Sequence, residues 1–223
     1  MRHKRLEEEA ADAATLRARL RHVYWIGGGS GAGKSTTARR LADRYGWRLY
    51  ATDDVMSDHA RRTTPEDAPF LHEFIAMDMD ERWVNRSPEV MLETFHWFRG
   101  EGFNLIVEDL LRLPPEPSVV VEGFRLLPHL VKPLLATPGQ AVWLLPTPEF
   151  SRAAIHSRAT PGGGFTRKAS DPEKADRNMA ERDQMCTQRL CEETERLELR
   201  TIEVDTMMTE DDLARLVTET FGL

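Results

Sequence analysis

Short apolar runs alternate with longer amphipathic segments along most of the chain. Runs of strand length, rich in β-branched and aromatic residues, lie at His22–Ile26, Trp47–Ala51, Ser118–Val121, Ala141–Leu145 and Leu199–Val204. The segments between them space apolar residues three and four apart, as Leu41, Ala42 and Tyr45 follow Ala38, which is helical spacing. Strands that alternate with helices predict an α/β protein with a parallel sheet.

The third run is apolar without alternation. Val119, Val120 and Val121 follow one another, and successive side chains of a strand point to opposite faces of a sheet. A strand that is apolar on both sides needs cover on both faces, as in parallel sheets flanked by helices. The run therefore favours a sheet between two helical layers.

A long helical block precedes the third run. It starts with Pro88 in the first turn, after Ser87, and its helical period continues beyond Gly100 and Gly102. Because glycine weakens a helix interior, we expect a kink or a break at these two positions. Three large aromatic residues of this region are interpreted as core or pocket wall: Trp83, Phe95 and Trp97.

A glycine-rich loop follows the first run. Residues 28–35 match the pattern G-x-x-x-x-G-K-S, in which glycines let backbone N–H groups turn toward phosphates and the next helix directs its positive end at them. Lys34 adds a charge for the γ-phosphate, and the Ser35 hydroxyl is a ligand for Mg²⁺. A flexible linker is the alternative, but the flanking strand and helix favour nucleotide binding. We expect ATP and Mg²⁺ as cofactors, bound by Gly28, Gly29, Ser30, Gly31, Ala32, Gly33, Lys34, Ser35 and Thr36.

Acidic residues follow two further runs. Asp53 and Asp54 come after the second run, and Glu122 comes directly after the third. In open parallel sheets ligands bind at the carboxyl ends of the strands, so these carboxylates are candidates to face the phosphate loop. The alternative for Asp53 and Asp54 is a solvated turn or a helix N-cap. The alternative for Glu122 is a tight turn at the end of its strand.

A basic segment separates the fourth and fifth runs. It combines three consecutive glycines at 162–164 with Arg158, Arg167 and Lys168. Glycine has no side chain to pack, so we expect a mobile cationic lid over about residues 158–172; a surface loop with incidental charge is the alternative. Five arginines lie in or near this segment: Arg152, Arg158, Arg167, Arg177 and Arg182. Most of them are expected to be surface charges, and Arg158 and Arg167 are the favoured functional candidates because they lie beside the glycines.

Composition bounds the partners and the compartment. The chain has 223 residues and a net charge of −7, which argues against a surface that coats nucleic acid. Cys186 and Cys191 are five apart in a helical stretch, a spacing that predicts neither a disulfide nor a metal pair. No apolar run approaches the ~18 residues that span a bilayer. We expect a cytoplasmic protein without a membrane partner, monomeric or homodimeric, with a peripheral helix over 1–21 and one domain over 22–223.

The order of these features resembles the P-loop kinases of small molecules, which include adenylate, shikimate, gluconate and chloramphenicol kinases. The loop after the first strand, the acidic pair after the second and the arginine-bearing lid between the fourth and fifth carry the resemblance, over roughly residues 21–221. It implies a five-stranded parallel sheet of order 2-3-1-4-5, flanked by helices. It implies no particular substrate, because this fold serves many acceptors.

The resemblance also implies roles for individual residues. Asp53 would take the proton of the acceptor hydroxyl, while Asp54 and Arg125 would contact the acceptor. Glu122 would hold a water on Mg²⁺, although the usual residue there is Asp. The catalytic residues would be Asp53 and Lys34, together with the lid arginines Arg158 and Arg167.

Taken together, these features predict a phosphotransferase that moves the γ-phosphate of ATP to a hydroxyl of a small molecule. A nucleoside, nucleotide or polynucleotide 5′-hydroxyl kinase is the runner-up, because the pair Asp53-Asp54 is similarly placed in polynucleotide kinases. A regulatory NTP-binding ATPase is a third possibility. The expected lid argues against it, since a lid is useful where a reaction must be shielded from water.

Overall fold

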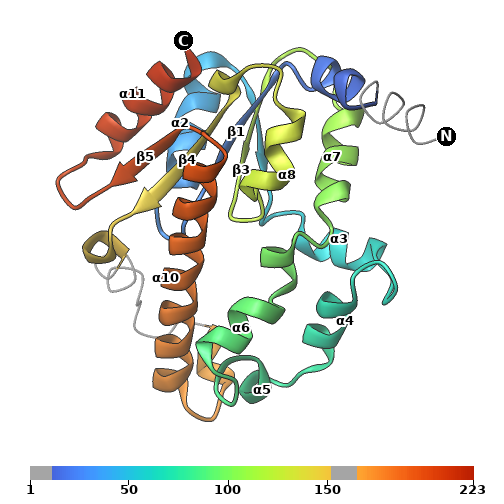
Figure 1. The fold of residues 1–223 in the computed structure, drawn as a ribbon, viewed down its shortest axis with the longest axis vertical. Coiled ribbons are helices and arrows are strands. Elements are labelled where there is room, and N and C mark those ends of the chain that lie inside the picture. Colours follow the sequence, from blue (N-terminus) through green and yellow to red (C-terminus); the bar gives the residue numbers. More distant parts are fainter. Residues whose placement is uncertain (1–11, 152–164) are drawn as a thin grey trace.

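Five parallel strands form the central sheet of the computed structural model, which describes residues 12–151 and 165–223 (Figure 1). The sheet order is β2-β3-β1-β4-β5, and every neighbouring pair is parallel. The strands are β1 (Val23–Gly28), β2 (Arg48–Ala51), β3 (Val119–Glu122), β4 (Ala141–Pro146) and β5 (Thr201–Val204). The expected α/β fold class and strand order are confirmed.

Strand β1 runs two residues beyond the apolar run that predicted it. Gly27 pairs with Trp143 and Gly28 with Leu144 of β4. A Cβ at Gly28 would lie 2.1 Å from the Leu144 carbonyl oxygen, and its φ is +128°, so only glycine fits. Because glycine has a low strand propensity, the apolar pattern does not show this extension. The phosphate loop therefore starts while the chain is still paired in the sheet.

One face of the sheet is covered by α2 (Lys34–Tyr45) and α11 (Glu210–Phe221). Strand side chains such as Ile26, Val120 and Val142 are fully buried against this layer. Helix α2 follows the phosphate loop directly, so its packing fixes the position of the loop.

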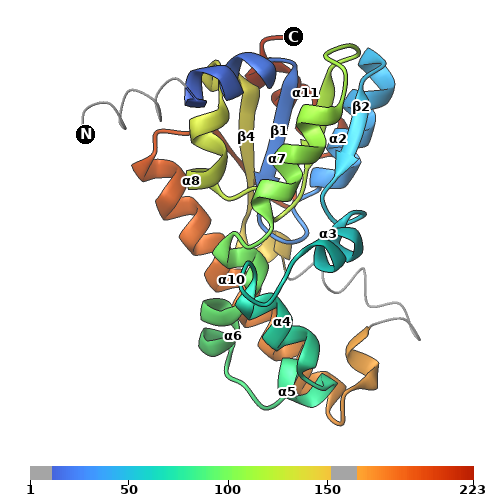
Figure 2. The same ribbon diagram turned by 90° about the vertical axis from the view of Figure 1, so that its right-hand side faces the viewer.

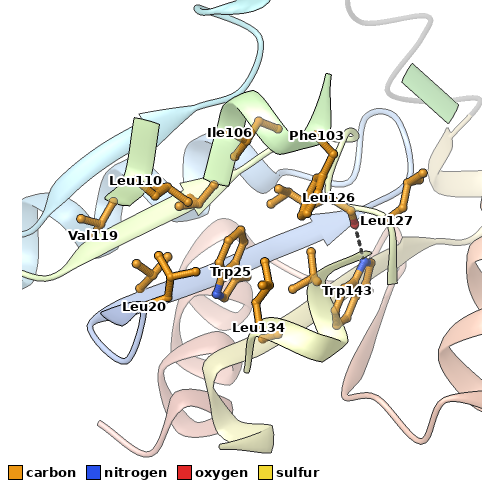
Figure 3. Packing of buried hydrophobic residues seen from close by; sticks show 14 of the residues in the cluster. Leu20, Trp25, Phe103, Ile106, Leu110, Val119, Leu126, Leu127, Leu134 and Trp143 are labelled. Carbon is orange, nitrogen blue, oxygen red and sulfur yellow. Dashed lines mark hydrogen bonds between the residues drawn. The ribbon is translucent and has the colours of Figure 1, made fainter. Parts of the chain in front are cut away.

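The other face is covered by α7 (Phe103–Arg112), α8 (Pro128–Val131) and α10 (Pro172–Arg196). Figure 3 shows the core of this layer, in which the indole N–H of Trp143 donates to the backbone carbonyl oxygen of Leu126 at 2.9 Å. The alternate strand residues thus reach two separate cores, as the uninterrupted valine run predicts.

The chain between β2 and β3 builds a helical part beside the carboxyl ends of the strands. It contains α3 (Met56–Arg62), α4 (Pro69–Ala76), α5 (Met79–Trp83), α6 (Pro88–Thr94) and the 3-10 helix η1 (His96–Arg99). In Figure 2, α4, α5 and α6 lie beyond the sheet and beside one end of α10. This part has its own apolar cluster, which joins these helices to α10.

The expected break in the long helical block is confirmed. Gly100 and Gly102 have φ values of +83° and +72° and separate η1 from α7. A Cβ at Gly100 would also lie 2.7 Å from a methyl group of Leu130. The glycines let the chain turn from the helical part back to the layer on the sheet.

Short 3-10 turns complete the described chain: η2 (Lys132–Leu134), η3 (Pro138–Gln140) and η4 (Phe165–Lys168). Residues 12–19 are helical, and Leu20 after them is fully buried. The Gln140 side chain donates to the carbonyl oxygens of Arg21 and Val23, at 2.9 and 3.2 Å, and so ties this segment to the sheet.

Both cysteines are free, as the spacing predicts. Within residues 12–151 and 165–223, no helix has the length and apolar character needed to cross a membrane.

Candidate active site

The phosphate loop connects the end of β1 to the start of α2. Gly28, Gly31 and Gly33 have positive φ values of 128°, 78° and 80°, a conformation that favours glycine. The Gly29 N–H donates to the Leu144 carbonyl oxygen at 2.9 Å, which anchors the loop to β4. Gly33 immediately precedes α2, so the N-terminus of that helix faces the concave side of the loop, the arrangement that binds phosphate.

Lys34 lies across this loop. Its Nζ donates to the Gly29 carbonyl oxygen at 2.6 Å, and the residue is 8% exposed. Burial raises the pKa values of Asp53 and Glu122, and the charge of Lys34 opposes this rise at both, so its ammonium acts on both carboxylates. The ammonium is thus held against the loop backbone, within range of both carboxylates.

Glu122 ends β3 beside the loop. Burial raises the pKa of its carboxyl group, and a hydrogen bond from Ser35 and the charge of Lys34 act in the opposite direction. Asp53 and Asp54 raise the pKa further. The two residues proposed to hold the metal, Ser35 and Glu122, are therefore in contact, and a group of like charges surrounds them that a cation would relieve.

Asp53 and Asp54 follow β2, and the Thr52 N–H donates to the Glu122 carbonyl oxygen at 2.9 Å. Burial by surrounding protein raises the pKa of Asp53, although Lys34 and Arg125 lower it and the residue keeps contact with solvent. Asp54 does not cap α3, whose N-cap is Val55 without a side-chain bond. The helix-capping alternative for Asp54 is therefore wrong.

Gly123 lets the ends of β2 and β3 approach each other. Its φ is +147°, and a Cβ there would lie 1.7 Å from the Thr52 hydroxyl oxygen. Any side chain at this position would collide with Thr52, the residue before Asp53.

The loop and the two carboxylates enclose a small cavity of about 120 Å³, which we call the phosphate cavity. Asp53, Glu122 and Phe124 line it together with residues 30–36 of the loop. No group of three or more His, Cys, Asp or Glu side chains in the described residues has the geometry of a protein-only metal site. Magnesium in kinases takes few ligands from the protein and the rest from phosphate and water, and the hard oxygens of Ser35 and Glu122 fit that role.

A second cavity of about 360 Å³ adjoins the first, and we call it the aromatic cavity. Ser30 and Phe124 line both cavities. The aromatic cavity extends from Gly28, Gly29 and Ser30 to side chains of the helical part and of α10, which are Met56, Phe74, Trp83, Phe95, His96, Trp97, Phe98, Met179, Arg182, Asp183 and Cys186. The pocket-wall interpretation of Trp83, Phe95 and Trp97 is confirmed.

Arg125 lies behind the wall of the aromatic cavity. It is 2% exposed, and its guanidinium lies 4.0 Å from the ring centre of Trp97. Nη1 donates to the Thr52 carbonyl oxygen at 3.3 Å and Nη2 to His59 Nδ1 at 3.0 Å. Burial lowers the pKa of Arg125 to about 10, so it stays charged at neutral pH. Direct contact with an acceptor stays a prediction, and the geometry favours a role through Trp97.

The predicted lid lies only partly within the described residues. Arg158 falls outside them, and so does Arg152. Arg167 is exposed on η4. The described end of the lid is held by the helical part, because the Ser170 N–H donates to Asp80 Oδ1 at 2.6 Å.

Arg182 is not a surface charge, contrary to the expectation for most of these arginines. It is 5% exposed and lines the aromatic cavity. A sequence signal was present: Arg182 occupies the helical stripe of α10 that also carries Ala175, Met179, Cys186 and Leu190. An arginine in an apolar stripe indicates a buried charge. His96 was also missed, because a lone histidine has no spacing that marks it.

No protein-family model matches the chain, and no curated protein matches it. Solved structures with similar folds include a gluconokinase from Sinorhizobium meliloti 1021, at 19% identity and a TM-score of 0.44, covering 91% of this chain and 93% of that one. An uncharacterized protein from Eubacterium ventriosum ATCC 27560 has 16% identity and a TM-score of 0.45, with 90% and 97% covered. The thymidylate kinase from Candida albicans has 15% identity and a TM-score of 0.43, with 90% of each chain covered.

Similarities at this level carry no argument about activity or substrate. The strand order and the position of the loop are observed in this structure itself and do not depend on those similarities. With the order β2-β3-β1-β4-β5 and a G-x-x-x-x-G-K-S loop between β1 and α2, the chain has a P-loop kinase-like α/β fold.

Proposed function

We propose that the protein is a Mg²⁺-dependent phosphotransferase that moves the γ-phosphate of ATP to a hydroxyl group of a small molecule. One observation carries this proposal: the loop, Lys34, Glu122 and Asp53 line one cavity, and a second cavity of ligand size adjoins it through Ser30 and Phe124. A nucleotide phosphate in the first cavity would face a molecule in the second.

The chain offers a group for each step of the transfer. Loop N–H groups and Lys34 would bind the phosphates, with Lys34 exchanging the Gly29 carbonyl oxygen for a phosphate oxygen. Mg²⁺, held by Ser35 and by Glu122 directly or through water, would neutralise phosphate charge. The acceptor oxygen attacks the γ-phosphorus, the bond to the β–γ bridging oxygen breaks and ADP leaves. Asp53 takes the hydroxyl proton.

Two other functions remain to be separated by experiment. A regulatory ATPase needs no acceptor site, whereas the aromatic cavity adjoins the loop and is large enough for one. A nucleoside, nucleotide or polynucleotide 5′-hydroxyl kinase would use the same residues around the loop. Stimulation of ATP turnover by an added small alcohol would favour the proposed function over the ATPase, and stimulation by nucleosides or oligonucleotides would favour the runner-up.

Nucleotide binding is tested first, by thermal and urea unfolding with and without Mg·ATP. A ligand that binds only the folded protein adds about 2.7 kcal/mol of stability at a hundredfold excess over Kd. We expect this gain for the wild type and for Lys174→Ala, an exposed lysine at the start of α10. Lys34→Ala should lose most of it, because the charge that meets the phosphates is gone. Absence of stabilisation in the wild type at millimolar Mg·ATP would overturn the proposal.

A further inference from the structure

The walls of the aromatic cavity define the chemistry of what it binds. Six phenylalanine and tryptophan rings face one volume of about 360 Å³, and two methionines and a cysteine complete the apolar lining. The rings already contact one another: the centroids of Phe74 and Trp83 are 5.4 Å apart, and those of Phe95 and Phe98 are 4.9 Å apart. A rigid lining of this kind gains most from an apolar, flat ligand.

Arg182 is the charged group of this lining. Its Nε and Nη2 both donate to Asp183 Oδ1, at 2.9 and 2.6 Å. Its guanidinium carbon lies 4.7 Å from the ring centre of Phe95 and 5.4 Å from those of Trp83 and Phe98. Nη1 is buried and has no hydrogen-bond partner among the described residues. A buried donor without a partner is rare in proteins, and one further acceptor oxygen would satisfy it.

His96 is the second polar group of the cavity with a nitrogen that makes no hydrogen bond within the described chain. It is 2% exposed, and this nitrogen is Nδ1. Burial lowers the pKa of His96 to about 3, with further lowering by Arg125, Arg182 and Arg82, so the ring is neutral. When the proton of the neutral ring is on Nδ1, this unpartnered nitrogen donates one hydrogen bond to an acceptor oxygen.

The same inventory excludes ligands that are hydroxylated along their whole length. A polyol brings a hydroxyl on each carbon, and each one loses its water partners on burial. The aromatic cavity offers Arg182, His96, Asp183 and the backbone near residues 28–30 as polar partners. These few polar partners suit a ligand with two polar groups: one beside Arg182 and His96, and one reacting hydroxyl beside the loop.

We propose that the acceptor is a largely apolar, ring-bearing alcohol or phenol that carries one carboxylate or carbonyl oxygen. The ring lies among the aromatic side chains, the oxygen meets Arg182 and His96, and the hydroxyl points toward the loop and Asp53. This proposal rests on the proposed function. In the transfer, the hydroxyl oxygen bonds to the γ-phosphorus, the bond to ADP breaks and the proton passes to Asp53.

The test uses binding rather than turnover, so that it does not depend on ATP. Trp83 and Trp97 line the cavity, and their fluorescence reports occupancy in the full chain. Three probes are titrated: 4-(hydroxymethyl)benzoate, benzyl alcohol and gluconate. We expect the aryl hydroxy acid to bind at least tenfold more tightly than either of the others. Benzyl alcohol lacks the carboxylate, and gluconate keeps it but is a polyol.

Two variants test whether the carboxylate of the bound probe lies beside Arg182. Arg182→Met keeps an unbranched apolar stem but removes the guanidinium, and should weaken 4-(hydroxymethyl)benzoate about tenfold or more, without affecting benzyl alcohol. Arg177→Met changes an exposed arginine of the same helix and should leave both affinities unchanged. Thermal unfolding and Mg·ATP binding verify the fold of each variant. If Arg182→Met does not fold, the relative affinities of the three probes for the wild type still test the proposed ligand class.

Tight binding of gluconate, equal binding of the acid and the alcohol, or binding of none of the probes would overturn this inference. These failures are distinct from failure of the proposed function. A protein that binds the aryl hydroxy acid but not Mg·ATP keeps the cavity assignment and loses the phosphotransfer. A protein that binds Mg·ATP but prefers gluconate loses only the assignment.

Discussion

At the scale of single residues, the sequence predicts best what lies within one short segment. Lys34 and Ser35 belong to eight consecutive residues whose spacing by itself predicts phosphate and Mg²⁺ binding. Glu122 and Asp53 come from separate strands, yet the structure brings them to one cavity, because the carboxyl ends of neighbouring parallel strands share an edge. Arg182 is marked only as a charge within the apolar stripe of α10, and His96 has no local signal, since both reach the cavity through contacts between α10 and the helical part.

Asp53 is predicted to be the base, and Asp53→Asn keeps its shape while removing the proton acceptor. With an acceptor that the wild type phosphorylates, kcat should fall by about 10²–10⁴, and stabilisation by Mg·ATP should persist. Steady-state kinetics and unfolding with ligand measure the two effects. The matched variant Asp54→Asn should raise KM more than it lowers kcat. The opposite result, with Asp54→Asn inactive and Asp53→Asn near normal, would assign the base to Asp54.

Gly123 allows a test of the strand ends that position Asp53 and Glu122. Gly123→Ala adds a Cβ that would lie 1.7 Å from the Thr52 hydroxyl oxygen, at a φ of +147°. The free energy of unfolding should fall by about 3 kcal/mol or more, because both the clash and the backbone strain act. Gly139→Ala is the control, since its nearest contact would be an ordinary 3.5 Å. Urea unfolding that gives equal stability for both variants would contradict this geometry.

At the scale of elements, Asp109 joins the segment after Asp53 to the rest of the fold. His59 Nε2 of α3 is 2.8 Å from Asp109 Oδ2 of α7, and the Tyr50 hydroxyl of β2 donates to the same oxygen at 2.9 Å. Arg62 Nη1 donates to Asp109 Oδ1 at 2.8 Å. Because Arg125 donates to His59 Nδ1, the neutral ring carries its proton on Nε2. The chain of bonds runs from α7 through α3 to Arg125 behind Trp97.

Removing the Asp109 charge should loosen this connection. Burial alone would raise the pKa of Asp109, but hydrogen bonds from His59, Arg62 and Tyr50 lower it to about 2, from 3.8. A lowered carboxyl pKa contributes stability at neutral pH that is lost as the pH falls from about 4 to 2. Asp109→Asn should therefore cost about 2 kcal/mol at pH 7, and the difference from wild type should shrink below pH 4.

Urea unfolding at several pH values measures this effect. Glu108→Gln is the neighbouring control: its carboxylate is 3.1 Å from Arg62 but 47% exposed, and exposed ion pairs contribute little. Equal losses in the two variants, or a loss for Asp109→Asn that is independent of pH, would show that this network does not bind α3 to α7. The sequence does not reveal the network, because its members come from β2, α3 and α7 and none has a motif.

At the scale of the whole molecule, the pattern predicts the sheet because each strand carries its own apolar run and the connections between strands are helical. The strand order follows from the resemblance to P-loop kinases, since no local pattern states which strands are neighbours. The helical part is harder to predict. Its five short elements depend on an apolar cluster shared with α10, so their propensities alone do not define where each one begins and ends.

The two cavities join the sheet to the helical part, and that arrangement predicts how ligands act on the whole molecule. A ligand in the aromatic cavity contacts Gly28, Gly29 and Ser30 at the sheet and also Phe74 and Trp83 of α4 and α5. It therefore adds a further link between two parts that α10 and the Asp109 network also join. Mg·ATP alone should slow amide hydrogen exchange in residues 28–36, because the loop N–H groups become hydrogen-bonded.

Mg·ATP together with 4-(hydroxymethyl)benzoate should extend this protection to α4, α5 and residues 165–172, whose Ser170 N–H is bonded to Asp80 of α5. Exchange measured by mass spectrometry compares the free protein, each ligand alone and both ligands. Lys34→Ala is the control: it should keep any protection caused by the aryl hydroxy acid and lose the part caused by Mg·ATP. Protection that stays confined to the loop with both ligands present would show that the helical part responds to neither, and that the two cavities are occupied independently.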